Sequence, residues 1–197
     1  MSLFGLYGKS ALYKNIDLKT GNSEIQYNFE NNIFAEGSIV FNQKLYVLTY
    51  KENKIFVFNP ESLNLENTYY YKNEGWGLTT DNEYLIASDG SSKLYFMDKD
   101  LNITKEIIVT NNGKAINNIN ELEYINGYIW ANIWQTNNII IIDKQTGNVI
   151  KTIDFTGLYN NFNDTRNVLN GIAYNEENES IYITGKCWDT LFEFELK

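Results

Sequence analysis

Residues 120–138 read NELEYINGYIWANIWQTNN, two apolar stretches separated by an Asn126-Gly127 turn. Successive side chains of a strand point to opposite faces, and both faces of the second stretch are largely apolar. This pattern predicts a strand buried on both sides. Asn132 lies in this strand between two tryptophans. Because a buried amide is costly unless it forms hydrogen bonds, Asn132 either ties strands together or contacts a ligand, and we expect the structural role.

The same succession of short strand, polar turn, apolar strand, turn and apolar strand occurs four times along the chain. The four copies begin at Glu36, Trp76, Asn120 and Asn170. A spacing of about 40 to 50 residues is typical of propeller blades. A β-sandwich is the alternative, but an even, sequential repeat favours the propeller.

We therefore predict an all-β chain that forms a single domain over residues 1–197, a five-bladed β-propeller. The first blade is expected to be incomplete, because the opening segment matches only the second half of the repeat and two strands are missing. The predicted blades cover approximately residues 4–30, 34–70, 74–110, 119–155 and 168–197.

Composition narrows the possible functions. Hydrophobic residues make up 43% and aromatic residues 15% of the chain, a content that favours strands. The net charge of −9 without a basic cluster argues against nucleic acid or an anionic membrane as partner. No apolar run is long enough to span a membrane, and no signal peptide is present on the sequence. These features do not decide the cellular compartment.

The chain has no histidine and one cysteine, Cys187. An intrachain disulfide is therefore impossible, and any catalysis must use Glu, Asp, Lys or Tyr. A structural cation on the propeller axis has no supporting ligand motif, so we expect no metal site and no cofactor.

The first strand of each propeller blade lines the central channel, and residues just before it crowd around the axis. Here these positions are 34–37, 74–77, 120–122 and 169–171, which hold carboxylates, amides, a tryptophan and glycines. Such a set is consistent with a ligand pocket at the channel mouth. Glycines also occur there simply because inner strands pack closely.

Several ordered motifs resemble one known family. They are FAEG at 34–37, EGWGLTTD at 74–81, NELEYINGYIWANIWQT at 120–136 and ITGKCWDTLFEFEL at 183–196. Together they resemble the plant and bacterial type of glutaminyl-peptide cyclotransferase, over a match that runs from about residue 5 to the C-terminus. The resemblance implies a five-bladed propeller and a metal-independent enzyme that converts the N-terminal glutamine of peptides or proteins into pyroglutamate and releases ammonia.

The resemblance also implies roles for individual residues. Glu36 matches the acid/base carboxylate, Lys186 a pocket lysine and Asn120 a pocket amide. Each has a structural alternative: a hydrogen bond that links blades for Glu36, an internal salt bridge for Lys186, and turn capping for Asn120. The residues that match the aromatic walls around the substrate are Phe34, Tyr50, Trp76 and Trp134. Trp130 is expected to pack between blades instead.

Two departures from the family keep a second function open. The family begins with a segment containing a Phe-Thr-Gln-Gly-Leu motif, which this sequence lacks, and Tyr50 stands where the family has tryptophan. The alternative is thus a non-catalytic propeller that serves as a binding or interaction module.

The expected partner is a peptide or protein with an N-terminal glutamine. The expected oligomeric state is a monomer, and a dimer formed through the open blade is the alternative.

Overall fold

The structure is a computed structural model that describes residues 2–5, 7–14, 17–160 and 167–196. Met1 and Lys197, the ends of the predicted domain, lie outside the described residues. Every regular element in the described part of the chain is a β-strand, and none of it is a helix able to cross a membrane.

The strands form sheets in chain order, and within each sheet consecutive strands pair antiparallel. The first sheet contains β1 (Ser2–Phe4), β2 (Ala11–Lys14) and β3 (Glu24–Asn28). The second contains β4 (Ala35–Phe41), β5 (Lys44–Thr49), β6 (Lys54–Phe58) and β7 (Leu65–Tyr70). The third contains β8 (Leu78–Thr80), β9 (Leu85–Ser88), β10 (Lys93–Met97) and β11 (Ile103–Ile108).

A small hairpin and two further sheets complete the described chain. The hairpin contains β12 (Thr110–Asn111) and β13 (Lys114–Ala115). The next sheet contains β14 (Ile119–Ile125), β15 (Tyr128–Ile133), β16 (Asn138–Asp143) and β17 (Val149–Asp154). The last contains β18 (Val168–Asn175), β19 (Ser180–Lys186) and β20 (Phe192–Glu195).

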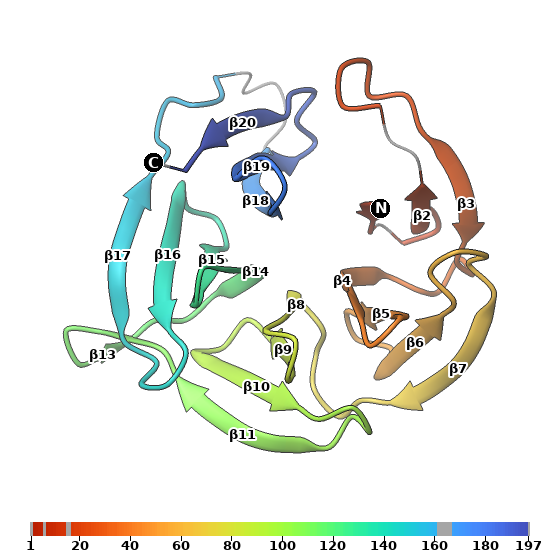
Figure 1. Ribbon diagram of the computed structural model, residues 1–197, viewed down its shortest axis with the longest axis horizontal. Coiled ribbons are helices and arrows are strands. Elements are labelled where there is room, and N and C mark those ends of the chain that lie inside the picture. The colour runs from red at the N-terminus through yellow and green to blue at the C-terminus, as the bar shows by residue number, and fades with distance from the viewer. Residues whose placement is uncertain (1, 6, 15–16, 161–166, 197) are drawn as a thin grey trace.

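The sheets are arranged around a common centre, so the fold is propeller-like and not a two-layer sandwich. Figure 1 shows β4, β8, β14 and β18 towards the middle and β7, β11 and β17 at the rim. The inner strands β4, β8, β14 and β18 contact one another in this order, and β1 contacts β4. The first residues of β4, β8, β14 and β18 therefore meet at one end of the axis, where the residue that follows β1, Gly5, packs against Ala35.

The hydrophobic core consists of four clusters, each between two consecutive sheets. Trp130 belongs to the cluster between β14–β17 and β18–β20, where it packs with Leu169 and Ile172, as predicted. Asn132 is fully buried, and its Oδ1 accepts a hydrogen bond from the N–H of Gly171 at 3.1 Å. This bond ties β15 to β18, as expected for the structural role, while the Nδ2 of Asn132 has no hydrogen-bond partner among the described residues.

One expectation about the first sheet is wrong. Two of its strands were predicted to be missing, yet β1 pairs with β2 through the register Ser2↔Tyr13, Leu3↔Leu12 and Phe4↔Ala11. The first sheet therefore has three strands. Because β1 is only three residues long, it is too short to show an alternating pattern in the sequence.

Two glycines allow the inner strands to approach closely. A Cβ at Gly37 would lie 2.5 Å from the backbone nitrogen of Leu78 in β8. A Cβ at Gly77 would overlap with the carbonyl oxygen of Asn120 and lie 2.9 Å from the Cα of Glu121 in β14. Both glycines therefore place backbone directly against backbone.

We predict that Gly77→Ala lowers the free energy of unfolding by about 1 to 3 kcal/mol, because the new methyl group collides with backbone that cannot move away. Chemical denaturation measures the change. Gly171→Ala is the matched control, since its Cβ would meet the side-chain Cγ2 of Thr184 at 2.7 Å, and a side chain can adjust. Equal losses of unfolding free energy in the two variants would contradict the conclusion that Gly77 packs directly against backbone.

Candidate active site

Glu36 is the second residue of β4, at the end of the axis where the inner strands begin. Its Oε1 lies 3.4 Å from the Nζ of Lys186, the last residue of β19. The side chain of Glu36 is 16% exposed and that of Lys186 31%, so the pair is largely shielded from water. The two residues, 150 positions apart in the sequence, thus form one ion pair.

The environment of Glu36 makes it suited to proton transfer near neutral pH. Burial raises the pKa of Glu36 to about 7, although the Lys186 ammonium acts in the opposite direction, and the Glu52 carboxylate adds to the increase. A carboxyl group with such a pKa exists in both protonation states at pH 7. This is the property that a general acid/base requires.

Backbone hydrogen bonds fix this end of β4 against the neighbouring sheet. The N–H of Gly37 donates to the carbonyl oxygen of Trp76 at 2.8 Å. The N–H of Gly77 donates to the hydroxyl of Ser88 at 2.8 Å, and that hydroxyl donates to the carbonyl oxygen of Asn120 at 2.7 Å. Three inner strands are thereby connected beside Glu36.

Asn120 is 4% exposed, and its Oδ1 has no hydrogen-bond partner among the described residues. This oxygen therefore does not cap a turn, which was the structural alternative for Asn120. A buried acceptor without a partner costs free energy. The Asn120 amide is therefore a group that a bound polar molecule could satisfy.

The four aromatic residues predicted for the site lie together as a continuous array. Ring centroids are 5.7 Å apart for Phe34 and Tyr50, 6.2 Å for Tyr50 and Trp76, and 6.4 Å for Trp76 and Trp134. All three pairs are edge-to-face, the arrangement favoured by aromatic quadrupoles. The array extends at Phe34 to Tyr7, at 5.0 Å.

Lys186 connects this array to Glu36. Its Nζ lies 5.6 Å from the centroid of Phe34 and 5.0 Å from that of Trp134, within the range of cation–π contacts. The structure thus brings together six of the seven residues singled out by the sequence, Glu36, Lys186, Phe34, Tyr50, Trp76 and Trp134. The seventh, Asn120, lies in the inner strand β14, and its backbone carbonyl accepts from Ser88.

Sequence reasoning gave no role to several residues that border this site. Glu121, next to Asn120 in β14, has a pKa raised to about 8 by burial and by the like charges of Glu36 and Glu123. Two further carboxylates contact the aromatic array. Glu52 accepts a hydrogen bond from the N–H of Phe34 at 3.4 Å, and Glu74 accepts one from the indole N–H of Trp76 at 3.1 Å. The sequence signal for Glu121 was its place in a first strand beside Asn120.

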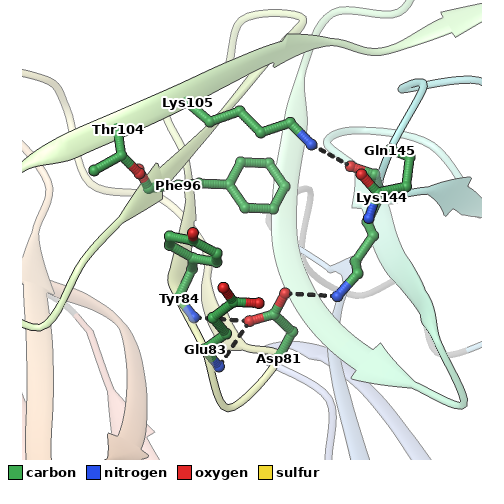
Figure 2. Close-up of a pocket in the computed structure, with 8 residues that line it drawn as sticks. All are labelled: Asp81, Glu83, Tyr84, Phe96, Thr104, Lys105, Lys144 and Gln145. Atoms are coloured by element: carbon green, nitrogen blue, oxygen red, sulfur yellow. Dashed lines mark hydrogen bonds and ion pairs between the residues drawn. The ribbon is translucent and has the colours of Figure 1, made fainter.

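A separate pocket of about 310 Å³ lies at the other end of the inner strands (Figure 2). Lys144 pairs there with Asp81 at 2.8 Å, and Lys105 donates to the carbonyl oxygen of Lys144 at 3.1 Å. Asp81 follows β8, whereas Trp76 precedes it, so this pocket does not include the Glu36 site. This pocket lies between two neighbouring sheets and is lined mainly by polar side chains.

The chain is similar to known proteins over nearly its full length. A family model described as glutamine cyclotransferase matches residues 2–196. The chain belongs to the glutamine cyclotransferase family. It is 36% identical over 199 residues to a glutaminyl-peptide cyclotransferase of Arabidopsis thaliana, a match that covers 98% of this chain and 62% of the relative. The chain therefore spans less than two thirds of the length of that curated relative.

Solved structures agree with the family. A crystal structure of Myxococcus xanthus glutaminyl cyclase superposes with a TM-score of 0.85 at 33% identity, covering 97% of this chain and 84% of the other. A luciferin-regenerating enzyme superposes with a TM-score of 0.60 at 14% identity, covering 92% and 64%. The second likeness concerns the fold alone.

Among the described residues, no group of three or more Cys, Asp or Glu side chains has the arrangement of a metal site. The acidic residues near the axis instead face Lys186 or backbone N–H groups, as Glu123 does with the N–H of Tyr174 at 2.8 Å.

We predict that Lys144→Met lowers the free energy of unfolding by about 3 kcal/mol at pH 7, because it leaves the Asp81 carboxylate, 2% exposed, without its ion-pair partner. Burial raises the pKa of Asp81, but hydrogen bonds from Lys144 and from the N–H groups of Tyr84 and Glu83 outweigh it, so the net pKa is lowered.

A lowered carboxyl pKa stabilises the fold above the unfolded-state pKa of about 3.9, and the contribution is lost as pH falls through the folded-state pKa. Wild type and Lys144→Met should therefore differ most at neutral pH and converge in acid. Lys99→Met, at an exposed lysine paired with the exposed Asp100, is the control. A Lys144 variant as stable as this control at pH 7 would contradict the prediction.

Proposed function

We propose that this protein is a glutaminyl-peptide cyclotransferase that acts on peptides or proteins with an N-terminal glutamine. The observation that carries the proposal is the shielded Glu36–Lys186 ion pair at 3.4 Å, set against the array of Phe34, Tyr50, Trp76 and Trp134. Family membership supports the same reaction.

The reaction closes a ring within the substrate. The α-amine of the glutamine attacks the δ-carbon of its own side-chain amide, a C–N bond forms, and the bond to the amide nitrogen breaks. One proton leaves the attacking amine, and one proton must reach the departing nitrogen so that ammonia is released. A single carboxyl group that accepts the first proton and then donates it satisfies both needs.

Glu36 is assigned this shuttle, because its pKa of about 7 allows it to be a base at the start and an acid at the end of one cycle. Lys186 is assigned to the oxygen of the substrate amide, on which negative charge develops. The unpartnered Oδ1 of Asn120 is assigned to accept an N–H of the substrate. No step in this scheme needs a metal ion.

The aromatic array is assigned to the glutamine side chain. Its walls would hold the chain of the glutamine in the curled conformation that brings amine and carbonyl carbon together. They would also exclude water, which strengthens the interactions of Lys186 with the developing charge. Tyr50 in place of the family tryptophan leaves a smaller wall, which we expect to affect affinity more than mechanism.

We infer that the fold is a five-bladed propeller in which the two three-stranded sheets are blades. Contacts from β1 to β4 and from β14 to β18 support this inference, since they link the two three-stranded sheets to the four-stranded ones. We also infer that the protein acts as a monomer, since every residue assigned to the site comes from one chain.

We predict that Glu36→Gln folds normally and loses roughly 10² to 10⁴ in kcat for ammonia release from a short Gln-initiated peptide, the usual contribution of a placed acid/base. The uncatalysed cyclisation must be subtracted. Glu123→Gln is the matched control, because its side-chain oxygen can still accept from Tyr174. Retention of the wild-type rate by Glu36→Gln would remove Glu36 from this role, and no ammonia release by folded wild type would favour the binding module instead.

We predict that Lys186→Ala reduces kcat by about 10², the typical effect of removing one oxyanion donor. The salt-bridge alternative makes a different prediction, in which melting temperature falls together with activity. Measuring Tm and kcat on the same samples separates the two. A large loss of Tm that accounts for the loss of rate would contradict the assignment of Lys186 to the substrate oxygen.

A further inference from the structure

Glu121 is a partly buried carboxyl group that the scheme above does not use. It lies in β14 between Asn120 and Leu122, both of which are at least 96% buried. The Cα of Glu121 is the atom that a Cβ on Gly77 would approach to 2.9 Å, and Gly37 packs in the same way against β8. Gly37 thus packs β4 against β8 and Gly77 packs β8 against β14, so Glu36 and Glu121 lie at the same end of the axis on inner strands that β8 separates.

Charged groups face these two carboxyls from several elements. Lys186 comes from β19, Glu123 from β14 and Glu52 from the turn after β5, whereas residues 76–80 of the intervening inner strand contain no titratable side chain. Glu123 has its own hydrogen bond from Tyr174 of β18. Among the described residues that face Glu36 and Glu121, Lys186 is the one cation, and it can balance only one negative charge.

The two carboxyls differ in how readily they ionise. Burial raises the pKa of Glu121 to about 8, with the charge of Glu36 as the next cause, whereas the pKa of Glu36 is about 7. When two such groups interact, their protons leave in two separate steps. Between these steps the cluster holds one ionised carboxyl, one neutral carboxyl and one ammonium, so its charges balance.

We propose that Glu121 is a positioning residue that must stay protonated for the reaction. Neutral Glu121 does not attract Lys186, so Lys186 stays paired with Glu36 and can also reach the substrate oxygen. Ionised Glu121 competes for Lys186 and weakens its interaction with that oxygen. Glu121 exchanges no proton with the substrate: the amine proton goes to Glu36 and leaves with ammonia. The inference rests on the proposed cyclotransferase function.

The test is the pH profile of kcat for ammonia release, measured for wild type and Glu121→Gln. Glutamine mimics the neutral acid, so the variant should keep wild-type activity at pH 7 within about threefold. Between pH 7 and 9 the wild type should lose rate roughly tenfold relative to the variant, as expected for ionisation of one group with a pKa of about 8. Glu123→Gln is the control and should keep the alkaline loss, with its midpoint moved to lower pH because the charge of Glu123 raises the pKa of Glu121.

Two activity results would overturn the inference: an alkaline loss unchanged in Glu121→Gln, or a folded Glu121→Gln that is inactive at pH 7. A purely structural role would change Tm without changing the shape of the profile.

Infrared titration of protonated carboxyl groups gives a readout that does not depend on activity. Glu121→Gln should lack the component that disappears with a midpoint near pH 8 in wild type. If wild type releases no ammonia, the proposed function fails, yet the spectra still decide whether Glu121 carries the proton. Identical infrared titrations of the two proteins would contradict the inference.

Discussion

The site depends on one constraint: the Glu36 carboxylate is held largely out of water with the Lys186 ammonium beside it. Desolvation alone would favour the neutral acid, and the Lys186 charge alone would favour the carboxylate. Their balance gives a pKa of about 7. The edge-to-face array from Phe34 to Trp134 contributes to this balance, because two of its rings contact the Lys186 ammonium.

Close packing of the inner strands makes this arrangement possible. At Gly37 and Gly77, backbone lies against backbone, so carboxyls from different sheets reach the same end of the axis. The buried bonds from Ser88 to Asn120 and from Gly171 to Asn132 fix the sheets that supply Asn120 and Trp134. Interactions that look purely structural therefore also position the site.

Much of the fold and the assigned site could be predicted from the sequence, because the relevant signals are local. Alternating strands, turns such as Asn126-Gly127 and the spacing of the repeats indicated a propeller, and ordered motifs identified Glu36 and Lys186. The three-residue β1 was missed because it is too short for a pattern. The sequence places Glu121 in a first strand beside Asn120, but how closely β8 and β14 approach at Gly77 is revealed by no local signal.

The most direct test of this account is the pKa of Glu36 itself, measured by NMR titration of carboxyl-labelled glutamate in wild type, with Glu36→Gln to assign the signal. The account predicts a midpoint at about pH 7 and a higher value in Lys186→Met, where the opposing charge is gone. A midpoint near the ordinary value of about 4.3 would contradict it, because Glu36 would then be a solvated carboxylate unable to act as an acid at neutral pH.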